Sequence, residues 1–239
     1  MIPLPKPQKY TSRLISIEKV SSNMYLERFE LLNPTDITFL AGQTIMLYVA
    51  PGINRSMSIA SPPSDTHIIL LAHDVSPNGA YAKWALAAKV GDQMNFMGPL
   101  GVFVLDKESP RKKVIVATGS GIAPYRSMLL DYLPSAAGEI TLYWGLRREE
   151  DIFWQKELEE LAAKYPNFHV VMTLSQPTDA WQSAGGRRGH VQEHMFAEQK
   201  NLTDMDWYLC GSKAMINETR DKLKAAAVPD TQVKFELFF

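Results

Sequence analysis

The chain has 239 residues, of which 46% are hydrophobic, and a formal net charge of −1. This length can bury one large core or two of ordinary size, and the charge balance excludes a basic surface for nucleic acid or an acidic membrane. The single cysteine, Cys210, excludes an internal disulfide, a cysteine-ligated zinc site and an iron–sulfur cluster held by this chain alone. No apolar run approaches the roughly 20 residues of a membrane span, and the proline-punctuated start lacks the apolar region of a signal peptide, so we expect a cytoplasmic protein.

The first hundred residues predict an all-β region. Apolar and polar residues alternate in several short runs, which is typical of strands with one buried face. Residues 81–90 have helical composition instead, and Gly98-Pro99-Leu100-Gly101 is expected to form a turn. Short strands at this spacing indicate a small closed or nearly closed barrel. The strands are expected at residues 13–20, 25–31, 44–50, 68–73 and 93–97.

Residues 106–113 form a charged segment that contains Pro110. The pattern of the sequence changes there, from short successive strands to strands that alternate with helices. We place a domain boundary there, between residues 108 and 109. Beyond it, strand-like runs alternate with helical patterns, which predicts right-handed βαβ units and a parallel sheet. Ser212 is expected to cap one of the helices. The later strands are expected at residues 114–118, 140–145, 169–174, 207–210 and 233–238, with apolar helical stripes at Trp154, Leu158, Leu161 and Tyr165 and at Ile216, Thr219, Leu223 and Ala226.

Residues 114–124 combine a buried β-branched strand, two glycines and a proline at which a helix can begin. The free N–H groups and the positive dipole end of that helix, expected over residues 123–133, would face an anion. Gly119 and Gly121 would let a pyrophosphate approach the backbone, although an ordinary tight turn explains the same residues. Ligands bind at the carboxyl ends of the strands in a parallel sheet. Three further loops fall at that edge, at residues 145–147, 174–176 and 210–211.

Five segments, in this order along the chain, resemble motifs of the ferredoxin–NADP reductase superfamily. Together they cover the chain from about residue 10 to its end. The resemblance implies an antiparallel β-barrel flavin domain, residues 1–108, followed by an α/β parallel-sheet, Rossmann-like nucleotide-binding domain, residues 109–239. The segments are Arg55-Ser56-Met57-Ser58, Gly98-Pro99-Leu100-Gly101-Val102-Phe103, Thr118-Gly119-Ser120-Gly121-Ile122-Ala123-Pro124, Tyr208-Leu209-Cys210-Gly211-Ser212-Lys213-Ala214-Met215 and Phe235-Glu236-Leu237-Phe238-Phe239.

The activity that this resemblance implies is that of an NAD(P)H-dependent flavoprotein oxidoreductase. Hydride would pass from the nicotinamide to FAD, and electrons would then pass to a separate small-molecule or protein acceptor, because the chain lacks cluster-binding cysteines. FAD is expected as the cofactor rather than FMN or free flavin, with NADH or NADPH as the co-substrate. Among members of the family, the chain is similar to the reductase modules of bacterial oxygenases and to the small flavin reductases.

The resemblance assigns the flavin contacts to the first domain. Arg55 would offer a planar fork to a flavin phosphate, and Ser58 would hydrogen-bond near the flavin N5, where hydride arrives. Met57 stands where the family usually has an aromatic side chain, and its sulfur can pack on a ring but stacks less well. His73 either borders the flavin or is an ordinary residue at a strand end. Further contacts are expected from Ser56, Gly79, Ala80 and Tyr81.

The resemblance places the nucleotide in the second domain. Cys210 would lie beside the nicotinamide and shape the transfer geometry rather than act as a nucleophile; a buried structural cysteine is the alternative. Glu236 would hold the site or assist proton transfer, and Phe238 or Phe239 would cover the flavin. The catalytic set is therefore Ser58, Cys210 and Glu236. Nucleotide contacts are expected from Thr118, Gly119, Ser120, Gly121, Ala123, Pro124, Gly145, Arg147, Ser175, Gln176, Gly211 and Met215.

Three other interpretations are weighed against this one. The protein could reduce free flavin as a diffusible substrate, which Met57 favours, or it could be a catalytically silent flavin- or nucleotide-binding module of a larger assembly. The segment 190–194 matches the H-x-x-E-H pattern of some zinc peptidases. It follows a glycine-rich helix entry at residues 185–189, and no acidic third ligand stands out downstream. We therefore expect no metal site.

Overall fold

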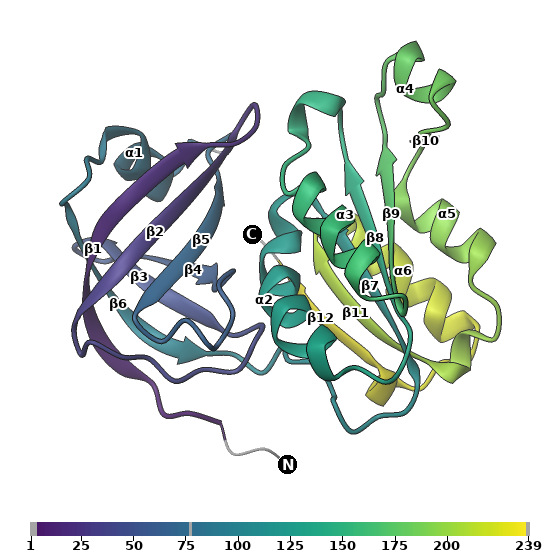
Figure 1. Ribbon diagram of the computed structural model, residues 1–239, viewed down its shortest axis with the longest axis horizontal. Helices are drawn as coiled ribbons and strands as arrows, with labels where there is room; N and C mark the ends of the chain where they lie inside the picture. The colour runs from purple at the N-terminus through teal and green to yellow at the C-terminus, as the bar shows by residue number, and fades with distance from the viewer. Residues whose placement is uncertain (1–3, 77, 238–239) are drawn as a thin grey trace. The chain divides into compact units, whose positions relative to one another are not determined.

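The computed structural model describes residues 4–76 and 78–237 (Figure 1). Contacts group the chain into two compact units. The first contains the chain up to Leu105 together with Ala123–Asp131, and the second contains Asp106–Ile122 and the chain from Tyr132 onward. Most of the helix that follows the glycine segment thus packs with the first unit. The expected boundary after residue 108 stays a prediction.

The first unit contains a six-stranded antiparallel sheet that curves into a half-barrel, in the order β4-β3-β6-β1-β2-β5 (Figure 1). Its outer strands meet where β4 has ended, since the N–H of Ala60 donates to the carbonyl oxygen of Leu70 at 2.8 Å. This confirms the predicted nearly closed barrel. The strands are β1 (Gln8–Lys19), β2 (Met24–Asn33), β3 (Thr44–Ala50), β4 (Ile53–Ser58), β5 (Ile68–Asp74) and β6 (Gln93–Leu100), and one helix, α1 (Ala80–Ala87), follows β5.

The core of this sheet follows from the two-residue period of its strands. Tyr10 and Leu14 point inward from β1, and each lies opposite an aromatic residue of a neighbouring strand, Phe96 of β6 and Phe29 of β2. The rings of Tyr10 and Phe96 stack with their centroids 4.8 Å apart. These two cross-strand pairs bury large apolar side chains in the half-barrel and help to fix its register.

Two predictions for this unit need correction, and one strand was missed. The expected turn at residues 98–101 is wrong, because β6 continues through Leu100, which pairs with Thr44 of β3; the backbone takes a positive φ, +86°, at Gly101 just after the strand. The strand β4 was not expected, since most of its side chains are exposed and show no alternation of apolar and polar residues. The helix α1 ends at Ala87 rather than at residue 90, because Ala88 is already extended.

The second unit contains a parallel sheet in the order β10-β9-β8-β7-β11-β12, which confirms the predicted α/β architecture. The run from Val114 to Ala117 is completely buried, as a strand covered on both faces should be. The short edge strand β10 had no signal in the sequence. The strands are β7 (Lys112–Thr118), β8 (Ile140–Leu146), β9 (Phe168–Leu174), β10 (Arg187–Arg188), β11 (Met205–Gly211) and β12 (Val233–Leu237).

Helices follow these strands. The predicted cap is confirmed, since the hydroxyl oxygen of Ser212 accepts the N–H of Met215 at 3.3 Å and begins α6. Of the expected stripe on the earlier helix α3, only Leu158 is buried. No helix in the described ranges is long and apolar enough to cross a membrane. The helices are α2 (Ala123–Tyr132), α3 (Gln155–Lys164), α4 (Asp179–Ser183), α5 (Val191–Glu198) and α6 (Lys213–Ala225), with 3₁₀ turns η1 (Gly119–Ile122), η2 (Leu133–Ser135), η3 (Glu149–Asp151), η4 (Leu202–Asp204) and η5 (Asp230–Gln232).

Candidate flavin and nucleotide sites

The turn after β7 lies directly against the end of β11. The hydroxyl oxygen of Thr118 accepts the N–H of Ser212 at 2.8 Å. A Cβ atom added to Gly211 would lie 2.2 Å from that same hydroxyl oxygen, and one added to Gly121 would lie 2.4 Å from the carbonyl oxygen of Cys210. Two glycines are therefore required so that these two backbone segments can approach each other.

Gly119 and Gly121 have different roles in this turn. Gly121 is accounted for by its packing against Cys210 and Gly211, so close approach to a pyrophosphate is not needed to explain it. Gly119 has φ +54°, and a Cβ atom there would meet no described heavy atom within 4 Å. Its carbonyl oxygen accepts the indole N–H of Trp144 at 3.0 Å. The backbone at Gly119 is thus held in place and open on its other side.

The parallel register brings the other predicted loops to the same edge of the sheet. Thr118 pairs with Gly145, and Gly145 with Thr173, so the ends of β7, β8 and β9 lie side by side. The N–H of Gln176 donates to the carbonyl oxygen of Arg147 at 2.8 Å, which joins the loops after β8 and β9. The expected convergence of these loops at one edge of the sheet is confirmed, and their binding of a ligand stays a prediction. Of the remaining predicted residues, Ser120 and Ser175 are half-buried, whereas Ala123, Pro124 and Met215 are buried at the starts of helices.

An acidic side chain joins the same two loops. Glu149, which follows the Arg147-Arg148 pair, accepts the N–H of Thr178 at 2.9 Å and its hydroxyl at 2.5 Å. The hydroxyl hydrogen bond is the main reason why the pKa of Glu149 is lowered. This carboxylate therefore carries its negative charge at neutral pH, in the same two loops that carry the exposed side chains of Arg147 and Gln176.

Cys210 is completely buried near the end of β11, and Glu236 pairs with it in register on β12. Burial raises the pKa of the Cys210 thiol well above its usual range, and the negative charge of Glu236 adds to the shift. The thiol is therefore protonated and uncharged at neutral pH. This state suits a residue that shapes a site and does not suit a nucleophile. Phe238, expected to cover the flavin, lies outside the described residues.

The Arg55-Ser56-Met57-Ser58 segment lies on β4, one of the two outer strands of the half-barrel. Arg55 is exposed, and its Nη1 donates to the carbonyl oxygen of Asn54 at 2.7 Å. Ser56 is also exposed, whereas Met57 is half-buried against the apolar core of the barrel and Ser58 is buried. The segment thus offers a charged donor at its outer end and a thioether nearer the core.

The helix α1 begins at Ala80, directly after Gly79 and shortly after β5, and no described side chain caps it. The second residue of the helix, Tyr81, has a buried side chain whose hydroxyl donates to Oε2 of Glu27. His73 Nδ1 lies 3.3 Å from Oε1 of the same carboxylate. The side chains of His73 and Tyr81 are therefore part of the barrel interior, and a cofactor contact by Tyr81 would have to come from its backbone.

Glu27 was missed because an isolated glutamate in an alternating strand resembles a surface charge. Its position carried the necessary signal, since it shares the two-residue period of Phe29 and Leu31, both of which are buried. A charged residue on the apolar face of a strand requires a buried partner. That requirement leads to Tyr81 and His73, which face it from two other elements.

The H-x-x-E-H segment acts as a helix start. The carboxylate of Glu193 accepts the N–H of His190 at 3.2 Å and so caps the first turn of α5. His194 Nε2 lies 2.8 Å from the carbonyl oxygen of Arg188. Within residues 4–76 and 78–237, no group of three or more His, Cys, Asp or Glu side chains could hold a metal ion. Helix capping accounts for the motif.

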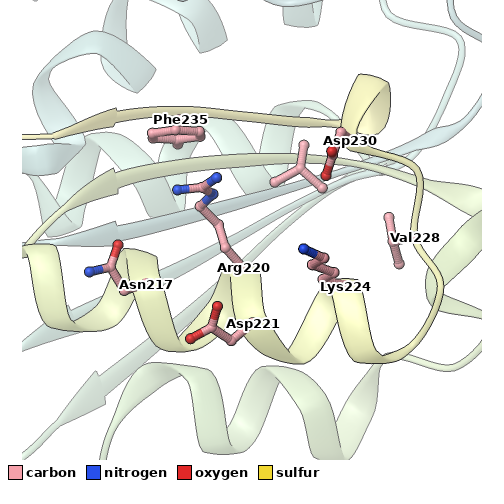
Figure 2. Close-up of a pocket in the computed structure, with 8 residues that line it drawn as sticks. Asn217, Arg220, Asp221, Lys224, Val228, Asp230 and Phe235 are labelled. Atoms are coloured by element: carbon pink, nitrogen blue, oxygen red, sulfur yellow. The ribbon is translucent and has the colours of Figure 1, made fainter.

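A cavity of about 340 Å³ lies between α6 and β12 (Figure 2). The Cζ atom of Arg220 stacks 4.0 Å from the centroid of the Phe235 ring. Two carboxylates, Asp221 and Asp230, line the cavity together with Arg220 and Lys224, so the charge of the lining is balanced. Of the predicted site residues that the structure describes, none lines this cavity, and we assign it no part in the reaction.

The donor groups in both units fit phosphate-bearing ligands. In the first unit, Arg55 presents an exposed guanidinium, and the uncapped start of α1 presents backbone N–H groups at the positive end of a helix dipole. In the second, the space beside Gly119 leaves its backbone accessible. A flavin dinucleotide and a nicotinamide dinucleotide both carry a pyrophosphate that such groups recognise.

Comparison with known proteins agrees with this fit. The family models described as "Oxidoreductase FAD-binding domain" and "Oxidoreductase NAD-binding domain" match residues 11–105 and 115–221. Ferredoxin–NADP reductase B of Sorangium cellulosum is 31% identical, covering 97% of this chain and 98% of that protein. The 2-halobenzoate 1,2-dioxygenase electron transfer component of Burkholderia cepacia is 30% identical, covering 98% of this chain and 68% of its own length.

Solved structures show the same fold. That of the Amycolatopsis cytochrome P450 reductase GcoB superposes with a TM-score of 0.88 at 23% identity, covering 100% of this chain and 72% of that one. The likeness to the Sorangium protein extends over nearly the whole length of both chains. The chain therefore belongs to the ferredoxin–NADP reductase family and is an NAD(P)H-dependent oxidoreductase with an FAD-binding domain and an NAD-binding domain.

Proposed function

We propose that this protein is the reductase of an electron-transfer pair, taking hydride from NADH or NADPH and passing electrons to a separate acceptor. The observation that carries the proposal is the convergence of Thr118, Gly119 and Cys210 at the carboxyl edge of the parallel sheet. A nicotinamide dinucleotide bound at this edge would have the uncharged thiol of Cys210 nearby. Bound FAD would supply the redox chemistry, accepting hydride and releasing electrons.

The residues of this chain would bind and orient the two ligands. Arg55, Ser56 and the backbone of Gly79, Ala80 and Tyr81 would hold the flavin phosphates. Met57 would lie against the flavin ring, and Ser58 would donate a hydrogen bond near the position that receives hydride. Cys210 and Glu236 would fix the nicotinamide end, while the loops after β7, β8 and β9 would hold the remainder of the nucleotide.

The acceptor we propose is a separate iron–sulfur or oxygenase protein. One cysteine among 239 residues cannot ligate a cysteine-bound cluster, so electrons would leave this chain for a partner. The Burkholderia relative is named as the electron transfer component of a dioxygenase, and about one third of its length lies outside the part that this chain covers. Since NADH and NADPH are supplied inside the cell, we place the reaction in the cytoplasm.

A second candidate is reduction of free flavin as a diffusible substrate. Met57 favours it, because this side chain is half-buried against the barrel core and offers no aromatic face to a flavin. A flavin held without that stacking interaction would dissociate more readily. The two candidates differ in whether the cofactor remains bound through purification.

The test is the visible spectrum of the purified protein, followed by anaerobic titration with NADH and with NADPH. Our proposal expects a yellow protein whose flavin absorbance is bleached by one equivalent of reduced nucleotide. A colourless protein whose oxidation of NADH rises with added FAD or riboflavin would replace it with the free-flavin candidate. Binding of NADH without oxidation, even with FAD present, would instead indicate a silent module.

A further inference from the structure

The half-barrel contains a carboxylate with no exposed surface. The side chain of Glu27, on β2, is 0% exposed. It contacts Tyr81 of α1 and His73 of β5, which are 54 and 46 residues away along the chain. A buried carboxylate is tolerated only where hydrogen-bond donors satisfy it. These donors come from two different elements, so the carboxylate ties α1 to the sheet.

Tyr81 is the residue of α1 that forms the hydrogen bond to Glu27. Burial, and next the charge of Glu27, hold the pKa of Tyr81 well above its usual range, so its phenol stays protonated and donates. Its ring lies 4.4 Å from the His73 ring and stacks on Trp84 at 5.6 Å with an interplanar angle of 9°. The first turn of α1 is thus fixed by one hydrogen bond and by ring contacts on both sides.

The helix α1 needs a contact of this kind to hold its first turn in position. It has eight residues, which is too short to be stable by itself, and no described side chain caps its start. It also has no acidic residue in its first turn. Without the contact to Glu27, the position and rotation of its first N–H groups would depend on apolar packing alone, which permits small sliding movements.

We infer that Glu27 is a positioning residue, which acts through the Tyr81 hydroxyl to hold the first N–H groups of α1 where they bind a phosphate of the flavin. The inference rests on the proposed binding of FAD at this helix. Glu27 does not touch the cofactor and takes no part in the transfer of electrons. Its contribution is that a helix start, which binds anions only when its N–H groups converge, is already fixed before the cofactor arrives.

The matched pair of variants is Tyr81→Phe and Tyr10→Phe. Both remove one hydroxyl from a buried tyrosine of the same half-barrel, but the Tyr10 hydroxyl accepts a hydrogen bond from Gln8, 2.6 Å away, and lies on β1 rather than on α1. A third variant, Glu27→Leu, keeps the approximate size of the side chain and removes both oxygens that accept hydrogen bonds. All are made in the full chain, freed of flavin before measurement.

Two measurements are made on each variant. Quenching of flavin fluorescence gives the dissociation constants of FAD, FMN and riboflavin, and hydrogen exchange gives the protection of the α1 amides without ligand. We expect Tyr81→Phe and Glu27→Leu to weaken the binding of FAD and FMN by about tenfold, and that of riboflavin, which lacks a phosphate, by no more than about twofold. Exchange should become faster in α1, whereas Tyr10→Phe should match the parent in both measurements.

The outcomes separate this inference from the proposed function. If the parent protein binds no FAD, both fail. If the parent binds FAD and Tyr81→Phe binds it equally well, or if α1 exchange is unchanged, only the positioning role fails. Equal loss of FAD and riboflavin would also overturn it, because the carboxylate would then support the barrel as a whole. If Tyr81→Phe does not fold, Glu27→Leu is judged by the same criteria.

Discussion

A Cβ atom on Gly121 would lie 2.4 Å from the carbonyl oxygen of Cys210, a distance that real Cβ contacts do not show. The carbonyl carbon of Cys210 and the Cα of Gly211 would lie at 2.7 and 2.8 Å. All three neighbours are backbone atoms, which cannot rotate away as the end of a side chain can. The turn that begins the nucleotide site and the strand end that carries Cys210 therefore depend on each other for their positions.

We predict that Gly121→Ala is destabilising while Gly119→Ala is tolerated. The first forces backbone apart and should lower the free energy of unfolding by about 3 kcal/mol, the upper part of the range for overpacking. The second adds a methyl group to open space at φ +54°, and should lower it by about 1 kcal/mol for the left-handed backbone. Urea denaturation measures both. Equal losses would show that packing against Cys210 does not explain Gly121.

Arg55→Ala should weaken FAD without unfolding the protein. A charge-assisted hydrogen bond to phosphate contributes about 1.5–3 kcal/mol, which corresponds to a ten- to hundredfold rise in the dissociation constant. The side chain is exposed and bonds to a neighbouring carbonyl oxygen, so its loss should leave the melting temperature within about 1 °C. Arg28→Ala, at an exposed position on β2, is the control and should bind FAD normally. Unchanged affinity in Arg55→Ala would remove this residue from the flavin site.

The sequence was most informative where a structure depends on a short stretch of neighbouring residues. The buried run from Val114 to Ala117 and the Ser212 cap were predicted because periodicity and capping are local properties. Strand β4 was missed because its backbone pairs with β3 while its side chains remain in solvent. The turn expected at Gly98 was wrong because the role of this glycine also depends on a neighbouring strand. A Cβ there would lie 2.7 Å from a methyl carbon of Ile45, so this glycine serves strand packing rather than a turn.

The candidate sites likewise contain some features that local patterns predict and others that depend on distant elements of the chain. The loops at the carboxyl edge follow from strand order, which alternation of strands and helices predicts. The tie from Glu27 to Tyr81 depends on β2, β5 and α1 meeting inside the barrel, which no local pattern specifies. Gly121 was identified, but a single sequence does not distinguish a glycine that faces a ligand from one that faces Cys210.

Gln176→Arg should shift the nucleotide preference toward NADPH. An arginine at this exposed position, next to the loop that carries Arg147, would add a donor for the 2′-phosphate that NADH lacks. We expect the KM for NADPH to fall by about tenfold and that for NADH to change by less than about twofold. The negative charge of Glu149 in the same loops should limit the gain. Gln176→Met is the uncharged control, and a parallel change for both nucleotides would contradict the assignment.

The thiol of Cys210 should resist alkylation in the folded protein. Its pKa is raised by burial, and further by Glu236, so at pH 8 it is a neutral thiol without access to solvent. Iodoacetamide should label it slowly until urea unfolds the chain. Because the folded state holds this proton more tightly than the unfolded state, the free energy of unfolding should fall as the pH rises above about 8.5. Cys210→Ala should show a smaller alkaline decrease; rapid labelling of the native protein would refute the shift.

Cys210→Ala should lower kcat more than it raises KM. The substitution keeps a small apolar side chain at a buried position, so the fold should persist with only the destabilisation of a small cavity. Hydride transfer depends on the geometry of the two rings, and slight misplacement can slow it by up to about a hundredfold. Stopped-flow measurement should therefore show slower reduction of the flavin, while the dissociation constant of the nucleotide stays within about threefold. Reduction at the parent rate would show that Cys210 is a structural residue of β11, and complete loss of reduction with normal nucleotide binding would indicate a chemical role that its protonated thiol does not predict.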